Sequence, residues 1–587
     1  MAVGVGGFVA LQAVEAAHAG IAGQRALLAA DTQLRERQFD LARAGLGRSA
    51  ANFRRARAKV AGLGLLGVVP VVGDQVRGVK AMAGAGEILA LGGTRIADAS
   101  ELVAGTQARE RPTADPLSDL RRTEEALAAG GATVDAAVAR VAPLRGTRLI
   151  GPLGRAYREL VRRLPTIKER TTSLHDGLGA FIAFAGGSGP RRYLIFSQNP
   201  DELRPTGGFI GTYGLLAADG GRLRLERYDS IESWAAPRPT VAVPPAAAAT
   251  AFKLLRPPAS QSLANVNATP DWPTAAQLAM QLWRQGGEAP VDGVISVTPE
   301  FLARILGVLG PVELRSYGEV VTAANVLDRL DYYAHGAPPG QSEAERKRFI
   351  AVLAPAVLDR LLSAPSSQWE PLATVIGQSF DARETIAWVT DDLVSAALAA
   401  RGWDGALPRA TGDFFYDGEL EYAAKNGRGL QRVFDHEVTL RDDGSARVRT
   451  TVTITNTQVP DAHNNIDSAS YITVYGPQGA TLAPDSDTPT AAEAAISGHP
   501  AFGWLRAAPP FGSTSFTVVW DVPELLLRWA GNAMEYDLWW MHVPAHTGDV
   551  LRLHVEPPPG WRWADVPPPP TSELDRDLRG SWLLTTT

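Results

Sequence analysis

Cysteine is absent from this chain, which excludes disulfide bonds, thiolate nucleophiles and cysteine-ligated metals. Familiar catalytic motifs are missing too: there is no G-x-S-x-G elbow, no G-x-x-x-x-G-K-[ST] loop and no H-E-x-x-H pair. Serine-hydrolase, P-loop NTPase and zincin functions therefore have no support. The net charge is -6 and no basic domain stands out, which argues against nucleic acid as a partner.

A metal site also lacks a good sequence signal. His542, His546 and His554 form the one histidine cluster, but Pro544 breaks any helix that would carry the first two as neighbouring ligands. The residue pattern therefore assigns no metal-binding residue.

The composition is that of a globular protein. Hydrophobic residues make up 45% and charged residues 20% of the 587 residues. A chain of this length is expected to fold as roughly three or four domains. We predict a multidomain α + α/β + β protein with these divisions: a segment at 1–14, a helical bundle at 15–187, an α/β domain with a helical extension at 188–405, and a β-sandwich at 410–587.

The first 14 residues are apolar and glycine-rich, and no charge precedes Glu15. This run is shorter than the about 20 residues of a membrane-spanning helix, and it lacks the basic start of a signal peptide. Three interpretations stay open: the remaining half of a membrane anchor, a buried first helix, or a segment at a membrane interface.

The following region is rich in alanine, leucine and arginine, with apolar residues at helical spacing. It predicts a bundle or stalk of long helices. The expected helices are one through Leu34, Phe39, Leu41 and Phe53, a second over Val76–Thr106, a third from Pro116 to about Val141, and a fourth over Tyr157–Phe184.

The central region alternates between strand and helix patterns. Short β-branched and aromatic runs predict strands at Tyr193–Ser197, Phe209–Leu216, Arg222–Tyr228, Val291–Val297 and Val312–Leu314. Helical spacing predicts helices at Thr274–Gln285, Pro299–Leu309, Glu319–Tyr333, Glu343–Leu362 and Arg383–Ala400. This order indicates a mixed sheet covered by helices.

From Gly412 onward, valine and threonine alternate with charged residues. The pattern predicts one antiparallel β-sandwich, with strands that include Val433–Leu440, Ala446–Thr455, Tyr471–Tyr475 and Thr514–Trp520. We expect a long inserted loop at Ala483–Pro500.

The corner between the first two central strands, Asn199–Gly208, concentrates the chemistry of this region. Arg204 offers a fork of donors for phosphate or carboxylate, and Gly207 and Gly208 let backbone N–H groups approach a ligand. Asp201 and Glu202 are able to hold a divalent cation or to pair with Arg204. The alternative is an ordinary loop stiffened by prolines, in which Glu202 and Arg204 form a structural ion pair.

The segment LIFSQNPDELRPTGGFIGTYGLL, the D-W-P loop, VDGVISVTPEFLARILGVLGPVEL and TGDFF together resemble an uncharacterised bacterial envelope family, known as a numbered domain of unknown function with the pattern N-x-x-E-x-R-P-T-G-G-F. Members of that family have one N-terminal membrane anchor. The resemblance implies an extracytoplasmic protein of the bacterial cell envelope with a single membrane pass, and it favours the anchor interpretation of residues 1–14.

The order of strands, corner and helices is also distantly similar to the LytR–CpsA–Psr family. Enzymes of that family transfer polyprenyl-pyrophosphate-linked glycopolymers to peptidoglycan with arginines and magnesium-binding aspartates. Arg204 matches the arginine of the family's R-x-D-T motif, while Asp229 and, more loosely, Arg227 match its P-R-D motif. Asn199 and Thr206 stand where the family has aspartates, so two carboxylates for Mg²⁺ are missing.

This resemblance implies a set of site residues and two functions. The expected ligand-binding residues are Asn199, Glu202, Arg204, Thr206, Gly207, Gly208, Arg227 and Asp229, and the candidate catalytic residues are Arg204, Asp229 and Glu202. One function is a phosphotransferase that handles polyprenyl-pyrophosphate-linked glycopolymers with Mg²⁺. The other, favoured by the missing aspartates, is a non-catalytic envelope module whose inherited pocket is structural or binds a carbohydrate, while the helical stalk and the β-sandwich mediate assembly. The expected partners are the membrane and a polyprenyl-phosphate lipid or an envelope glycopolymer.

Overall fold

The structure is a computed structural model, and it describes residues 2–61, 63, 72–107, 115, 117–234, 240–243, 253–255, 258–333, 343–421, 425, 427–459, 467–529, 533–544, 546 and 548–586. Side chains are also not described at some positions within helices and strands, among them residues 2–11, 13 and 102–107. The chain divides into two compact units, one made mainly of Met1–Gly189 and one made mainly of Pro190–Thr587.

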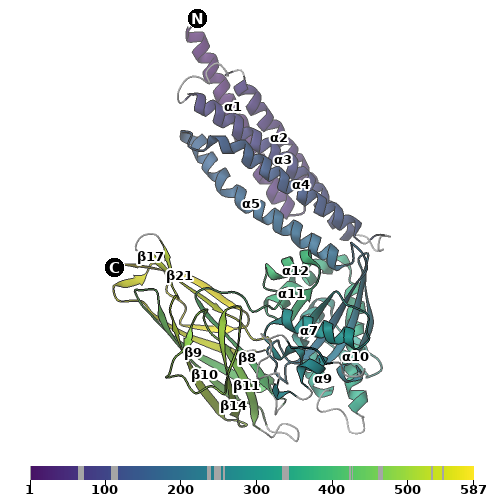
Figure 1. Cartoon of the computed structure of the whole chain (residues 1–587). Coiled ribbons are helices and arrows are strands. Elements are labelled where there is room, and N and C mark those ends of the chain that lie inside the picture. The colour runs from purple at the N-terminus through teal and green to yellow at the C-terminus, as the bar shows by residue number, and fades with distance from the viewer. Residues whose placement is uncertain are drawn as a thin grey trace. The chain divides into compact units, whose positions relative to one another are not determined.

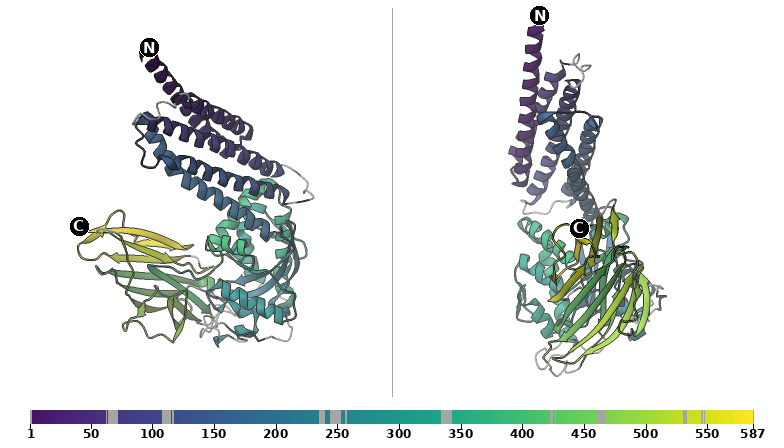
Figure 2. Two further views of the ribbon diagram at one scale, coloured as in Figure 1. Left: turned by 45° about the horizontal axis from the view of Figure 1, so that its top comes forward. Right: turned by 90° about the vertical axis from the view of Figure 1, so that its left-hand side faces the viewer.

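The first unit is helical. Its helices are α1 (Ala2–Arg35), α2 (Phe39–Ala61), α3 (Val72–Gln107), α4 (Ser118–Val141) and α5 (Gly151–Phe184). They lie side by side in all views (Figures 1 and 2), and each packs against the next along the chain. Small residues permit this close approach: a Cβ at Gly86 of α3 would lie 2.6 Å from the ring of Phe53 on α2.

The predicted helices over Val76–Thr106, Pro116–Val141 and Tyr157–Phe184 are confirmed by α3, α4 and α5. The prediction of one helix through Leu34 and Phe53 is wrong, because α1 ends at Arg35 and α2 begins at Phe39. Arg37 between them has a φ of 58°, a left-handed conformation that a continuing helix does not allow. Periodicity continues across this break, so the sequence pattern did not reveal it.

The proposed anchor falls within α1, but the side chains of residues 1–11 lie outside the described part. Among the described residues, the helical segment Ser118–Leu144 is long and apolar enough to cross a membrane by length and composition. Val134, Ala137 and Val141 of this segment also pack with Ala85 and Leu164 in a small core. The segment is therefore only weakly compatible with a membrane anchor.

The second unit begins with a five-stranded sheet in the order β3-β2-β1-β4-β7. The strands are β1 (Arg191–Asn199), β2 (Phe209–Asp219), β3 (Arg222–Ser230), β4 (Gly293–Val297) and β7 (Thr385–Val389). β1 runs parallel to β4 and antiparallel to β2, and β4 runs antiparallel to β7, so the sheet is mixed as predicted. Leu194 and Phe196 of β1 enter a core that includes Trp272 and Trp283.

Helices and a small hairpin complete this region. They are α7 (Trp272–Gln285), α8 (Pro299–Leu309), β5 (Val312–Leu314), β6 (Glu319–Val321), α9 (Val326–Asp331), α10 (Glu343–Leu362), α11 (Trp369–Asp381) and α12 (Asp392–Ala399). α7 begins where the Asp271 side chain accepts a hydrogen bond from the N–H of Thr274, at 3.1 Å.

Two helix predictions here are wrong in part. The predicted helix Glu319–Tyr333 begins with strand β6, which pairs with β5. The predicted helix Arg383–Ala400 contains strand β7 before α12, because the run Thr385–Val389 gains a ladder with β4 that a local pattern does not reveal.

The remainder of the second unit is made almost wholly of strands, drawn green to yellow in Figure 2. A six-stranded sheet has the order β12-β15-β10-β9-β18-β20, and an eight-stranded sheet has the order β13-β14-β11-β8-β17-β21-β19 with β16 paired to β17. The strands are β8 (Asp413–Glu421), β9 (Leu430–Leu440), β10 (Ala446–Asn456), β11 (Ser468–Tyr475), β12 (Thr481–Leu482), β13 (Ala491–Ile496), β14 (His499–Ala508), β15 (Ser513–Val522), β16 (Leu527–Trp529), β17 (Ala533–Trp540), β18 (Asp549–Glu556), β19 (Trp561–Trp563), β20 (Thr571–Leu574) and β21 (Leu578–Thr586).

One core contains residues of both sheets, such as Phe434 and Val452 from the first and Phe415 and Tyr536 from the second. The prediction that all strands of this region pair antiparallel is wrong in part, because β8 runs parallel to β17 and β9 runs parallel to β18. The expected loop at Ala483–Pro500 instead contains β13 and the start of β14, which pair with each other.

Candidate functional site

The corner between β1 and β2 is a compact turn held by its own backbone. The N–H of Gly207 donates to the carbonyl of Arg204 at 2.9 Å, and the N–H of Phe209 donates to the carbonyl of Glu202 at 2.8 Å. Gly208 has a φ of 157°, and a Cβ there would lie 2.2 Å from the carbonyl oxygen of Asn199. Only glycine fits this position, and the reason is the neighbouring backbone of the turn itself.

Arg204 lies at the centre of the corner and is only 3% exposed. Its Nη1 donates to the carbonyl oxygens of Leu203 (2.8 Å) and Glu421 (2.9 Å), and its Nη2 donates to Glu202 Oε1 at 3.1 Å. The guanidinium carbon lies 5.5 Å from the ring centre of Phe209. Burial lowers the pKa of Arg204, and the nearby Glu202 carboxylate acts in the opposite direction. Nη1 and Nη2 of Arg204 are thus engaged within the protein, while its Nε is buried and has no hydrogen-bond partner among the described residues.

Strand β8 and the segment after it hold the corner from the other side. The Tyr416 hydroxyl donates to the carbonyl of Pro205, and the N–H of Glu421 donates to the carbonyl of Leu203 at 3.1 Å. Asp201 pairs with Arg428 at 2.8 Å. The corner therefore joins the mixed sheet to the strand-rich region.

Side-chain amides and hydroxyls form a buried network behind the corner. The Nδ2 of Asn267 donates to Gln198 Oε1 (3.2 Å), Thr206 Oγ1 (3.1 Å) and the carbonyl of Gly208 (2.8 Å). The Nε2 of Gln198 donates to Ser296 on β4. Thr206 thus fixes the turn to the sheet through its hydroxyl.

Arg227 and Asp229 lie on β3 and have other partners. Arg227 makes two bonds to the carboxylate of Glu288, at 2.9 and 2.8 Å, and its guanidinium lies over the rings of Tyr213 and Trp283. This carboxylate raises the pKa of Arg227. Asp229 is exposed and accepts a hydrogen bond from the N–H of Ser230. The structure brings together Asn199, Glu202, Arg204, Thr206, Gly207 and Gly208, and it places these two residues outside that group.

A row of buried carboxylates on β8 was missed by sequence reasoning. The acids occupy alternate positions on a strand that is buried along its whole length: Asp413, Asp417, Glu419 and Glu421. Their even-numbered neighbours point to the opposite face, where Tyr416 reaches the corner. The spacing D-x-x-x-D-x-E-x-E was the available signal, since charges at period two on an otherwise apolar strand are unusual.

Few cations compensate these acids. Arg432 on β9 bonds Asp417 at 2.7 Å and also reaches Asp549, and its Nη1 lies 3.8 Å from Glu419. Burial raises the pKa of Asp417 to about 7, and it raises the pKa of Glu419 and Glu421 as well. Asp417, Glu419 and Glu421 therefore favour their protonated forms more than ordinary acidic side chains do.

Among the residues that the structure describes, no group of three or more histidine, aspartate or glutamate side chains is arranged to hold a metal ion. His542 and His546 are buried, and burial lowers the pKa of both. His554 lies on β18. Mg²⁺ stays a prediction from the resemblance alone.

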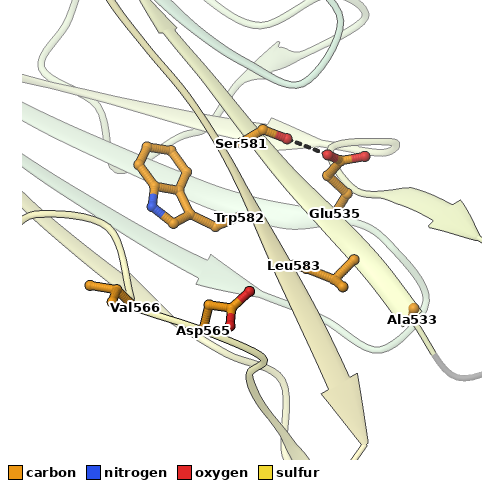
Figure 3. Close-up of a pocket in the computed structure, with 7 residues that line it drawn as sticks. All are labelled: Ala533, Glu535, Asp565, Val566, Ser581, Trp582 and Leu583. Atoms are coloured by element: carbon orange, nitrogen blue, oxygen red, sulfur yellow. Dashed lines mark hydrogen bonds between the residues drawn. The ribbon is translucent and has the colours of Figure 1, made fainter. Parts of the chain in front are cut away.

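An open cavity of about 630 Å³ lies beside β17 and β21, and none of its lining residues belongs to the corner. Figure 3 shows Ser581 on β21 facing Glu535 on β17, while Trp582 points to the other side of its strand. Asp565 and the exposed Val566 complete its wall.

Comparison with protein families gives one match. Residues 188–334 match the model of the family described as protein of unknown function, DUF4012. This segment contains the corner and runs from β1 to α9. No curated protein matches the chain. The match supports the predicted similarity to an uncharacterised family with a domain of unknown function.

Proposed function

We propose that this chain is a non-catalytic binding and assembly module of the bacterial cell envelope, tethered to the membrane by its N-terminal segment. Its central region would be a LytR–CpsA–Psr-like domain in which the ancestral corner has become structural, and its C-terminal region a β-sandwich. The observation that carries the proposal is the engagement of Arg204 by Leu203, Glu202 and Glu421 inside the protein.

The chemistry of the corner supports this proposal. Cleavage of a pyrophosphate requires cationic groups aimed at the developing charge, from arginine or metal. To bind a phosphate through Nη1 and Nη2, Arg204 would have to leave two backbone carbonyls and a carboxylate, and the buried carbonyl of Glu421 would lose this donor. The remaining donor, Nε, is itself buried. Asn199 and Thr206 supply no carboxylate in place of the family's aspartates.

The alternative function is phosphotransfer from a polyprenyl-pyrophosphate-linked glycopolymer. It is favoured by the position of the corner at the carboxyl end of β1, which runs parallel to β4, since ligands of α/β proteins bind at that edge of a sheet.

The test is an assay of the purified full chain with a polyprenyl-pyrophosphate-linked oligosaccharide, Mg²⁺ and a peptidoglycan acceptor. We expect no release of lipid phosphate above the level of a no-protein control, and the same result for Arg204→Lys. Release that needs Mg²⁺ and falls in the Arg204→Lys variant, with the fold intact by circular dichroism, would overturn the proposal and support the alternative.

A further inference from the structure

A second cavity, of about 250 Å³, is rich in arginine. The turn between α11 and β7, the segment after α12 and the turn between β20 and β21 supply its wall. Its charged lining residues are Arg383, Arg401, Arg576, Arg579, Asp381 and Asp577.

Asp577 organises the inner wall. Its carboxylate accepts hydrogen bonds from Arg383 Nε (3.0 Å), Arg579 Nη2 (3.3 Å), Trp539 Nε1 (3.0 Å) and the N–H of His542 (3.0 Å). Arg383 is buried, and it holds the pKa of Asp577 well below its usual range. These bonds hold the guanidinium groups of Arg383 and Arg579 in place, and they show that the wall already binds one carboxylate.

Arg401 is not neutralised in the same way. Its Nη1 donates to the carbonyl of Ala397 at 3.3 Å, and its guanidinium lies 5.2 Å from the ring centre of Trp403. No carboxylate pairs with Arg401 within the described part of the chain. Its remaining donors are free to bind a ligand.

Carboxylates pair with three of the four arginines of the wall. Arg576 makes two bonds to Asp575, at 3.0 and 2.8 Å, and Asp381 accepts a bond from Trp403. Arg383 and Arg579 pair with Asp577, and the charge of Asp404 also acts on Arg383. Arg401 is therefore the arginine of this wall without a carboxylate partner in the described part of the chain, and a ligand with one carboxylate would supply that partner.

The cavity lies at the edge where ligands of mixed α/β sheets commonly bind. Arg383 lies two residues before Thr385, the first residue of β7, which pairs with Val297, the last residue of β4. The cavity is thus near the carboxyl end of the parallel pair β1 and β4.

We propose that this arginine cavity binds a carboxylate monoanion, either a small carboxylic acid or the acid group of a uronic-acid saccharide. Guanidinium forks match a planar carboxylate, and the cavity volume suits a ligand the size of one sugar ring rather than a larger molecule. The site shares no residue with the corner, so the inference stands whether or not the proposed function is right.

Calorimetric titration of the full chain with glucuronate tests the inference, with glucose as the uncharged match. We expect glucuronate to bind with a dissociation constant on the order of 1 mM and glucose to give no heat. Arg401→Ala and Arg579→Ala should each weaken glucuronate binding about tenfold, equal to about 1.4 kcal/mol. Arg552→Ala is the matched control, because Arg552 is an exposed arginine on β18. Acetate is the second arm: tighter binding of glucuronate than of acetate would identify the saccharide as the source of the carboxylate, whereas equal affinity would identify the small acid.

Three results would overturn the inference. They are no binding of glucuronate by folded protein, equal affinities in Arg401→Ala and Arg552→Ala, or tighter binding of inorganic phosphate than of glucuronate. Circular dichroism of each variant separates lost binding from lost folding.

Discussion

Replacement of Arg204 by alanine should weaken the joint between the mixed sheet and the strand-rich region. The change removes three hydrogen bonds and leaves the carbonyl of Glu421 without this donor. Removing one partner of a buried ion pair typically costs 3–5 kcal/mol. Glu202 keeps Lys425 at 3.6 Å and retains some exposure, so we expect the lower end of that range, about 3 kcal/mol.

Arg227→Ala is a matched control from the same predicted site. Its side chain is 36% exposed and its ion pair with Glu288 is partly solvated, so we expect a loss of about 1 kcal/mol or less. Arg204→Lys should lie between the two, because lysine keeps the charge but lacks the fork that reaches Leu203, Glu421 and Glu202 together.

Urea unfolding followed by tryptophan fluorescence measures the difference. All 14 tryptophans of the chain follow Gly189, so the signal reports on the second unit alone. With a slope of about 3 kcal/mol per molar urea, Arg204→Ala should lower the midpoint by roughly 1 M. A midpoint for Arg204→Ala no lower than that for Arg227→Ala would refute the structural role of Arg204.

Three other changes test the surroundings of the corner with the same assay. Gly208→Ala should lower the free energy of unfolding by at least about 2 kcal/mol, because its Cβ would lie 2.2 Å from the carbonyl oxygen of Asn199. Gly211→Ala should lower it much less, because no atom lies within 4 Å of the added Cβ. Equal losses in the two variants would contradict the steric argument. Asn267→Ala should cost about 2 kcal/mol, since Gln198, Thr206 and Gly208 lose their shared donor, and an unchanged midpoint would show that the network contributes nothing. Glu419→Gln should become more stable relative to the wild type as the pH rises, because burial raises the pKa of Glu419. In the wild type, the stability that the protonated Glu419 contributes is fully present below the ordinary pKa of glutamate and is lost as the pH rises through the raised pKa. Glutamine does not titrate, so the variant does not lose stability in this way. Parallel midpoints of the two proteins between pH 5 and pH 8 would count against that assignment.

The sequence predicted the local structure of the corner between β1 and β2 but not its distant partners. The strands on either side and the glycines between them follow from short-range rules, namely β-branched runs and positions where a Cβ has no space. The alternative of a Glu202–Arg204 ion pair needed only neighbours in the chain, and the structure contains that pair at 3.1 Å. The partner that completes it, the carbonyl of Glu421, is 217 residues away, and no local pattern indicates which carbonyl Arg204 meets.

Local periodicity thus determined α3, α4, α5 and the hairpin of β1 and β2, because those elements depend on hydrogen bonds and side-chain spacing within short segments. Only the tertiary structure decided that Thr385–Val389 is a strand, since its ladder with β4 outweighs a helical pattern. The same holds for the arginine cavity, where Arg383 and Arg579 meet only because Asp577 binds both. The partners of a charged side chain are set by the tertiary fold, as for Arg204 and Arg383. The energy of each ion pair depends on how deeply it is buried, which the sequence does not specify residue by residue.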